Sequence, residues 1–329
     1  MHGVSLRAFR NGLAGLIVLG AVTACGPDLG KANFARTTVP AQPGSGEQAP
    51  DGPITDPAVT LAALRVVDPC GLVDKVSLAD LGTPAEPRAN TIDLGMCSNE
   101  VKDAGGKTVK IAVELGSSTL GSVDKVSGAV GGLPRIEDKS DDGSCDVTAL
   151  TSRSPDLGVR VNAVYTGGDA CRSAGSVLEV VVKRVHENPP KYEVDKGSLM
   201  DVDLCSVIDD QVVTTAVPAA RKSASGLHIC NWFGSGPTVS VAFTRGTKWT
   251  ESADYKKIDL GGGVSGFQKT KTTGSSDCTI KWQHRAISGD VGENLSLNYT
   301  YYSAEASKDD PCGKSLKLVQ NALTKLPTR

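Results

Sequence analysis

The chain has 329 residues, of which 35 are basic and 37 are acidic, so its formal net charge is −2. This near-neutral balance, without a local cluster of lysine and arginine, argues against nucleic acid as a partner, because binding to phosphates needs a basic surface. The length allows two domains, and a hydrophobic content of 39% is enough for packed cores.

The first 25 residues have the pattern of an export signal. Arg7 and Arg10 precede an apolar stretch over 13–22, which is too short to span a bilayer, because a spanning helix needs about 20 apolar residues. We therefore predict a signal peptide over 1–24 rather than a transmembrane anchor. The small residues before Cys25 resemble a bacterial lipobox, in which the cysteine thiol receives a lipid such as palmitate. This predicts a protein anchored through Cys25 to the extracytoplasmic face of the cell membrane.

After this signal, residues 25–59 combine the lipidated cysteine with a segment rich in proline, glycine and serine. Such a composition buries too little apolar surface to order itself. We expect a solvated stalk that separates the first domain from the membrane.

The first domain is expected over 60–187. Asp68 before Pro69 suits a helix N-cap with proline at the first helical position. Apolar residues alternate over 109–115, and again after Cys145 and over 159–165, which predicts half-buried strands. Apolar residues at helical spacing over 174–185 predict a closing amphipathic helix.

A second domain, expected over 198–329, repeats this order after a linker at 188–197 that contains Pro189 and Pro190. An opening segment is followed by alternating residues at 239–243 and 295–301, and by a terminal helix over 316–326. The sequence thus predicts an α+β fold of two tandem repeats. In each repeat we expect a small antiparallel sheet covered by helices.

The cysteines support the repeat. Eight remain besides Cys25, an even number that in an exported protein predicts disulfides. They are Cys70, Cys97, Cys145, Cys171, Cys205, Cys230, Cys278 and Cys312. The interval from Cys97 to Cys145 equals that from Cys230 to Cys278. Four cysteines allow three pairings in each repeat, and we favour pairing in sequence order, because it joins each terminal helix to a strand.

The segments around these cysteines resemble a known group of exported proteins. Asp68-Pro69-Cys70-Gly71-Leu72-Val73, together with Asp169-Ala170-Cys171 and the lipobox, looks like the actinobacterial Asp-Pro-Cys lipoproteins, exported domains without an assigned function. The second repeat has a weaker opening at Cys205 but keeps Cys230-Asn231-Trp232. The resemblance implies a surface-exposed α+β module with two disulfides per repeat, and it supplies no catalytic residues.

Motifs for catalysis, metals or cofactors are incomplete. Ser122 and Lys125 match the Ser-x-x-Lys of penicillin-binding enzymes but lack the partner motifs. Gly261, Gly263 and Gly266 fit Gly-x-Gly-x-x-Gly, yet no helical pattern follows, so we expect a flexible loop rather than a nucleotide site. The histidines after the signal are not at metal-ligand spacing. We therefore expect no catalytic set, no metal and no cofactor.

Aromatic residues are concentrated in the second repeat, which holds all three tryptophans. They fill its core or form a recognition face. For such a face we select Trp249 and Arg245, which lie past the end of a predicted strand, and Tyr302, which falls outside the alternation of its neighbours.

These observations together predict a non-catalytic binding or interaction module of the cell envelope, and therefore not an enzyme. Its expected partners are the membrane, through the lipid anchor, and a wall component, a small solute or an envelope protein. The alternative is a cell-wall-processing hydrolase with an unrecognised site.

Overall fold

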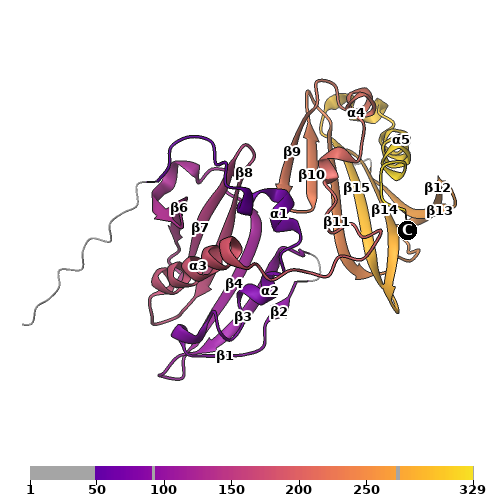
Figure 1. The fold of residues 1–329 in the computed structure, drawn as a ribbon. Coiled ribbons are helices and arrows are strands. Elements are labelled where there is room, and N and C mark those ends of the chain that lie inside the picture. Colours follow the sequence, from indigo (N-terminus) through magenta and orange to yellow (C-terminus); the bar gives the residue numbers. More distant parts are fainter. Residues whose placement is uncertain (1–48, 91–92, 272–274, 329) are drawn as a thin grey trace, which may run out of the picture. The chain divides into compact units, whose positions relative to one another are not determined.

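Two antiparallel sheets make up most of the computed structural model (Figure 1). The structure describes residues 49–90, 93–271 and 275–328. The predicted signal peptide, Cys25 and the stalk up to residue 48 lie outside these ranges. Among the described residues, no helix is long and apolar enough to cross a bilayer.

The first sheet has eight strands in the order β1-β3-β4-β8-β7-β6-β5, with β2 also paired to β3. On β4, Val109, Ile111 and Val113 are buried and the residues between them are not, because successive side chains of a strand point to opposite faces. The strands are β1 (Thr83–Pro84), β2 (Arg88–Ala89), β3 (Met96–Lys102), β4 (Thr108–Ser118), β5 (Val126–Val130), β6 (Leu133–Lys139), β7 (Ser144–Arg153) and β8 (Asp156–Val164).

The second sheet has seven strands in the order β12-β13-β14-β15-β11-β10-β9. The strands are β9 (Arg221–Gly226), β10 (Ile229–Phe233), β11 (Thr238–Thr247), β12 (Lys256–Gly261), β13 (Val264–Lys271), β14 (Ser276–Ser288) and β15 (Val291–Tyr301). Read from β10 to β12, this order equals that of the first sheet from β3 to β5. The two sheets are therefore consistent with the tandem repeat.

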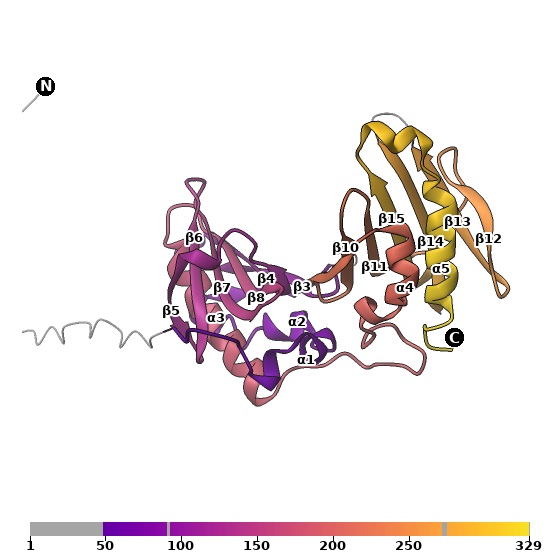
Figure 2. The same ribbon diagram turned by 90° about the horizontal axis from the view of Figure 1, so that it is seen from above.

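Each repeat has one long helix that packs on its sheet. Helix α3 (Ala170–Glu187) contacts β7 and β8, and α5 (Pro311–Leu323) contacts β14 and β15 (Figure 2). Asp169 and Asp310 cap these helices by accepting hydrogen bonds from backbone N–H groups of the first turn. The short helices are η1 (Pro57–Val59), α1 (Leu61–Arg65), α2 (Pro69–Leu72), η2 (Ala79–Leu81), η3 (Val123–Lys125), η4 (Leu204–Ser206), α4 (Asp210–Ala216) and η5 (Ala304–Lys308).

Four disulfides are present, so the expectation of disulfide bonds is confirmed. They follow the sequence order and link a helical segment to a strand in every case. The pairs are Cys70–Cys97, Cys145–Cys171, Cys205–Cys230 and Cys278–Cys312.

The predicted α+β class, with a small sheet covered by helices in each repeat, is wrong. The fold is mostly β, and helices do not cover the second sheet, because α5 packs along β14 and β15 with only the short α4 beside it. Segments 221–226, 256–261 and 264–271 are polar or rich in glycine and show weak alternation. They become strands by hydrogen bonding to a neighbour near the sheet edge, a contact that local pattern does not encode.

The last part of the predicted stalk contacts the first repeat. Arg153 donates hydrogen bonds to the carbonyls of Pro50 and Gly52. Asp56 accepts from the backbone N–H of Ala58, and Val59 is buried in the first core. Residues from about Pro50 onward are therefore held against the first repeat.

Candidate functional site

A hairpin turn forms one side of the candidate site. Gly261 pairs with Val264 across the turn between β12 and β13, and Gly262 and Gly263 have φ angles of 61° and 74°. Positive φ at both central positions defines the tight turn that matches the twist of a hairpin, and glycine adopts it without strain. The glycine segment expected to be a flexible loop is therefore a two-residue hairpin turn, with Gly266 inside β13.

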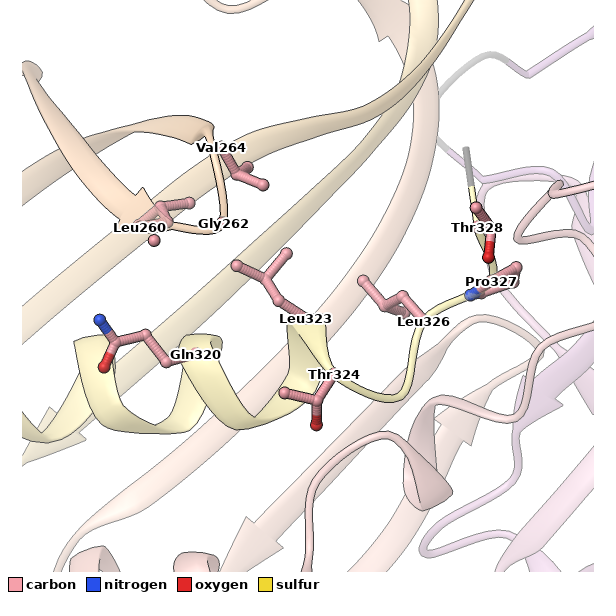
Figure 3. Close-up of a pocket in the computed structure, with 10 residues that line it drawn as sticks. Leu260, Gly262, Val264, Gln320, Leu323, Thr324, Leu326, Pro327 and Thr328 are labelled. Carbon is pink, nitrogen blue, oxygen red and sulfur yellow. The ribbon is translucent and has the colours of Figure 1, made fainter.

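Helix α5 forms the other side. Its first turn is held to β14 by the Cys278–Cys312 disulfide, and Leu318, Val319 and Ala322 are buried against the sheet. These contacts fix the direction of the helix, so its last turn passes close to the hairpin (Figure 3).

The end of α5 is fixed by a polar contact to the segment before α4. Asn321 Nδ2 donates to Asp209 at 2.8 Å, and the Asp209 backbone N–H donates to Asn321 Oδ1 at 2.8 Å. Lys325 Nζ lies 2.9 Å from the same carboxylate. The hydrogen bond from Asn321 and the ammonium of Lys325 lower the pKa of Asp209. Beyond this anchor the chain leaves the helix through Leu326 and Pro327.

Between the hairpin and the helix end lies an open groove of about 680 Å³ (Figure 3). Figure 3 shows Leu323 extending from the helix toward the hairpin, which carries Leu260 and Val264. Among the described residues, the lining combines apolar side chains with amide and hydroxyl groups in comparable measure and contains no charged side chain. It consists of Leu260, Gly261, Gly262, Val264, Gln320, Leu323, Thr324, Leu326, Pro327 and Thr328.

In the first repeat the corresponding turn packs against its helix. Its hairpin turn also consists of two glycines with positive φ, but a Cβ atom placed on Gly131 would lie 2.6 Å from Val182 of α3. By position after the helix cysteine, Val182 corresponds to Leu323. On Gly262, the counterpart of Gly131, a Cβ would meet nothing within 4 Å. The first turn glycine thus touches the helix in the first repeat, whereas its counterpart in the second repeat does not.

A different hollow beside α3 has the opposite chemistry. It has a volume of about 470 Å³, lies along the first half of the helix, and is lined by charged side chains that include Arg135, Glu137, Asp169 and Glu179. The two repeats therefore differ in the kind of surface that each offers beside its helix.

Arg245, selected from the sequence, belongs to a buried charge cluster. Its guanidinium lies 3.5 Å from Glu293, which has no exposed surface. Glu293 also receives hydrogen bonds from Ser198, the Leu199 backbone N–H and Arg285. Burial alone would raise the pKa of Glu293, but these bonds outweigh it and lower the pKa. Arg245 therefore compensates an internal carboxylate.

The structure does not bring the three selected residues together. Arg245 follows Phe243 on the buried face of β11, whereas Trp249 contacts Lys281, on the opposite face of the sheet. Tyr302 has 74% of its surface exposed and stands two residues after Thr300. Thr300 pairs with Thr238, which begins β11, whereas Arg245 is near the end of that strand. They do not form one recognition face.

Of the residues that line the groove, the sequence motif points only to Gly261. Leu323 and Leu326 have the helical spacing of the predicted terminal helix, so their pattern does not distinguish a groove from a core position. One signal in the sequence indicates the groove. Leu326 and Pro327 stand beyond the last turn of α5, so the packing of the helix on the sheet does not by itself account for apolar residues there.

A grouping of Glu137 with Cys145 and Cys171 resembles a metal-ligand set by distance alone. The two sulfur atoms are joined in a disulfide, so they carry no thiolate, the form that binds metals. The grouping is therefore the surroundings of a disulfide.

Comparison with protein-family models finds no match, and comparison with curated proteins finds none either. Among solved structures, DynU16 of the dynemicin biosynthetic locus is 12% identical, covering 84% of this chain and 93% of that chain, with a TM-score of 0.17. The di-domain ARO/CYC StfQ of the steffimycin biosynthetic pathway is 11% identical and covers 79% of this chain and 91% of that chain, with a TM-score of 0.15. MucB, solved in complex with MucA, is 10% identical and covers 77% of this chain and 97% of that chain, also with a TM-score of 0.15. These TM-scores support no assignment of fold or function, and no family is shown for the chain.

Proposed function

We propose that this protein is a non-catalytic binding module of the cell envelope, and that its second repeat holds the apolar chain of an amphiphilic ligand in the groove between the β12–β13 turn and α5. The observation that carries this proposal is the difference between the repeats. The same two-glycine turn rests on Val182 in the first repeat, whereas Gly262 and Leu323 line an open groove in the second.

The lining defines the class of ligand. A volume of about 680 Å³ falls within the range of roughly 300–1,000 Å³ that is typical of small-molecule sites. Leu323 and Leu326 are partly buried and offer apolar contact, and Gln320 and Thr328 offer hydrogen bonds. Because none of the described lining residues is charged, the part of the ligand inside the groove is uncharged, as an acyl chain is.

The disulfides support an extracytoplasmic location, because such bonds persist in oxidising compartments. A lipid anchor at Cys25 remains a prediction from the sequence. With that anchor, the groove would operate at a membrane surface, where molecules with acyl chains are abundant. A wall component or an envelope protein remains the alternative partner.

The test uses the chain from Gly26 onward, titrated with a fatty acid that carries an environment-sensitive fluorophore. Gln320→Trp fills the groove from α5, and Gln211→Trp is the matched control, because Gln211 is an exposed glutamine on helix α4 outside the groove. We expect saturable binding by the unchanged chain and the control, and affinity at least about tenfold weaker for Gln320→Trp. Absence of saturable binding, or equal weakening by both substitutions, would contradict the proposal.

A further inference from the structure

A second candidate site lies on the face of the second sheet that is turned away from the core. On β14, Lys281 stands between Ile280 and Trp282, which are fully buried, so its side chain leaves the opposite face. Its Nζ lies 4.0 Å from the ring centroid of Trp249 and 4.8 Å from that of Tyr255. The ammonium is thus in contact with two aromatic rings.

The segment between β11 and β12 holds these rings in place. The backbone N–H of Lys248 donates to the carbonyl of Asp290 at 2.7 Å, and that of Ser252 donates to the carbonyl of Tyr255 at 3.1 Å. The Tyr255 N–H donates in turn to Ser252 Oγ. These bonds hold the backbone next to both aromatic residues, so the segment that carries the rings is fixed in the protein without a ligand.

Lys281 differs from the neighbouring lysine in its partners. Lys269 lies over the same Tyr255 ring at 5.7 Å, and its ammonium is paired with Asp254 at 3.0 Å. Within the ranges that the structure describes, no carboxylate or other acceptor lies within bonding distance of Lys281 Nζ. Its three N–H donors therefore have no protein acceptor, although the rings hold the charge in position.

The fold itself does not require a lysine at this place. Lys281 pairs with Phe267 across β13 and β14, and the corresponding pair in the first repeat is Thr148 with Ile136. Thr148 and Ile136 are buried, with 6% and 3% of their surface exposed. Two uncharged residues thus occupy the corresponding positions of a sheet with the same strand order. The fold therefore does not explain the charge of Lys281.

We propose that Lys281 binds an oxyanion, a phosphate or a carboxylate carried by a solute, with Trp249 and Tyr255 as the walls of the site. A lysine ammonium is a compact cation with three donors and binds phosphate and carboxylate oxygens. Partial removal of water by the two rings strengthens this attraction. The site lies on the other face of the sheet from the groove and does not depend on it.

The experiment follows the indole N–H signal of Trp249 by NMR while inorganic phosphate, or separately acetate, is added to the chain from Gly26 onward. Lys281→Met keeps an apolar side chain against the rings and removes the charge. Lys257→Met removes the same charge from an exposed position on the edge strand β12, two strands away from Lys281. Lys281→Arg retains a cation.

We expect a saturable shift with at least one anion in the unchanged chain, affinity at least tenfold weaker in Lys281→Met, and binding within about twofold of the unchanged chain in Lys257→Met and Lys281→Arg. Absence of a saturable shift with either anion would overturn the proposal. Equal loss in Lys257→Met and Lys281→Met would also overturn it, because it would show a general effect of charge. Binding of phosphate but not acetate, or the reverse, would identify the oxyanion.

Discussion

Gly131 lies so close to Val182 that a Cβ atom at this glycine would be 2.6 Å from the Cγ1 atom of the valine. The contact joins the β5–β6 turn to helix α3, and it is absent from the second repeat, where a groove separates Gly262 from Leu323. Two hairpins of the same turn type therefore differ in one packing contact, and this difference should appear in the free energy of unfolding.

Alanine substitution at the two turns should have unequal effects. Gly131→Ala strains a residue with positive φ and also collides with Val182, so we expect a loss of about 3 kcal/mol in the free energy of unfolding. Gly262→Ala introduces only the backbone strain, so we expect it to lower the free energy of unfolding by about 1 kcal/mol. Urea denaturation measures both. Equal losses would show that the first hairpin does not rest on its helix.

The buried carboxylate of Glu293 should be important for stability. Glu293→Gln leaves Arg285 and Arg245 without their internal counter-charge, and breaking a buried pair typically costs about 3 kcal/mol. Glu137→Gln is the control, because its ion pair with Arg135 is partly exposed and should change stability by less than about 1 kcal/mol. If urea denaturation gives the same small change for both variants, the cluster around Glu293 is not a stabilising one.

The contact between Asp209 and Asn321 should depend on pH. The folded state lowers the pKa of Asp209 from its ordinary value of 3.8, so the contribution is complete above that value and is lost as the pH falls through the folded-state pKa. Asp209→Asn should therefore lower the urea midpoint at about pH 7, and its effect should decrease as the pH falls toward about 2 and the carboxylate becomes protonated. A difference that persists unchanged at low pH would show that the carboxylate charge does not matter.

His186 should hold the segment before the first repeat through both ring nitrogens. Nδ1 lies 2.9 Å from the carbonyl of Val182, and Nε2 lies 2.6 Å from the carboxylate of Asp56. Both ring nitrogens therefore face an oxygen acceptor, one on helix α3 and one on the segment before the first repeat. Burial tends to raise the pKa of Asp56, but the His186 and Ala58 hydrogen bonds lower it, so the contact is lost in strong acid as the carboxylate is protonated.

The measurement compares His186→Gln with the unchanged chain by urea denaturation. We expect this substitution to lower the urea midpoint at about pH 7, because a glutamine amide does not satisfy both acceptors in the same geometry. Lys183→Gln, at an exposed position on the same helix, should have a small effect. A change with His186→Gln no larger than that with Lys183→Gln would show that the ring does not hold this segment.

Much of the core could be predicted from local patterns. The alternation over 109–115 and 239–243 corresponds to β4 and β11, and the helical spacing over 174–185 corresponds to α3. The equal intervals between cysteines indicated two repeats, and pairing in sequence order agrees with the four disulfides. These features depend on residues near one another in the chain, where periodicity determines which face a side chain occupies.

The tertiary structure decided which of those faces are covered. Polar and glycine-rich segments became edge strands through pairing with neighbours, which changed the class from α+β to mostly β. Leu323 has the same helical spacing as a core residue, yet the distance between α5 and the β12–β13 turn leaves it in a groove. Lys281 gained two aromatic neighbours because a distant segment folds over its strand. Sequence determines the direction of each side chain, whereas its surroundings depend on elements far apart in the chain.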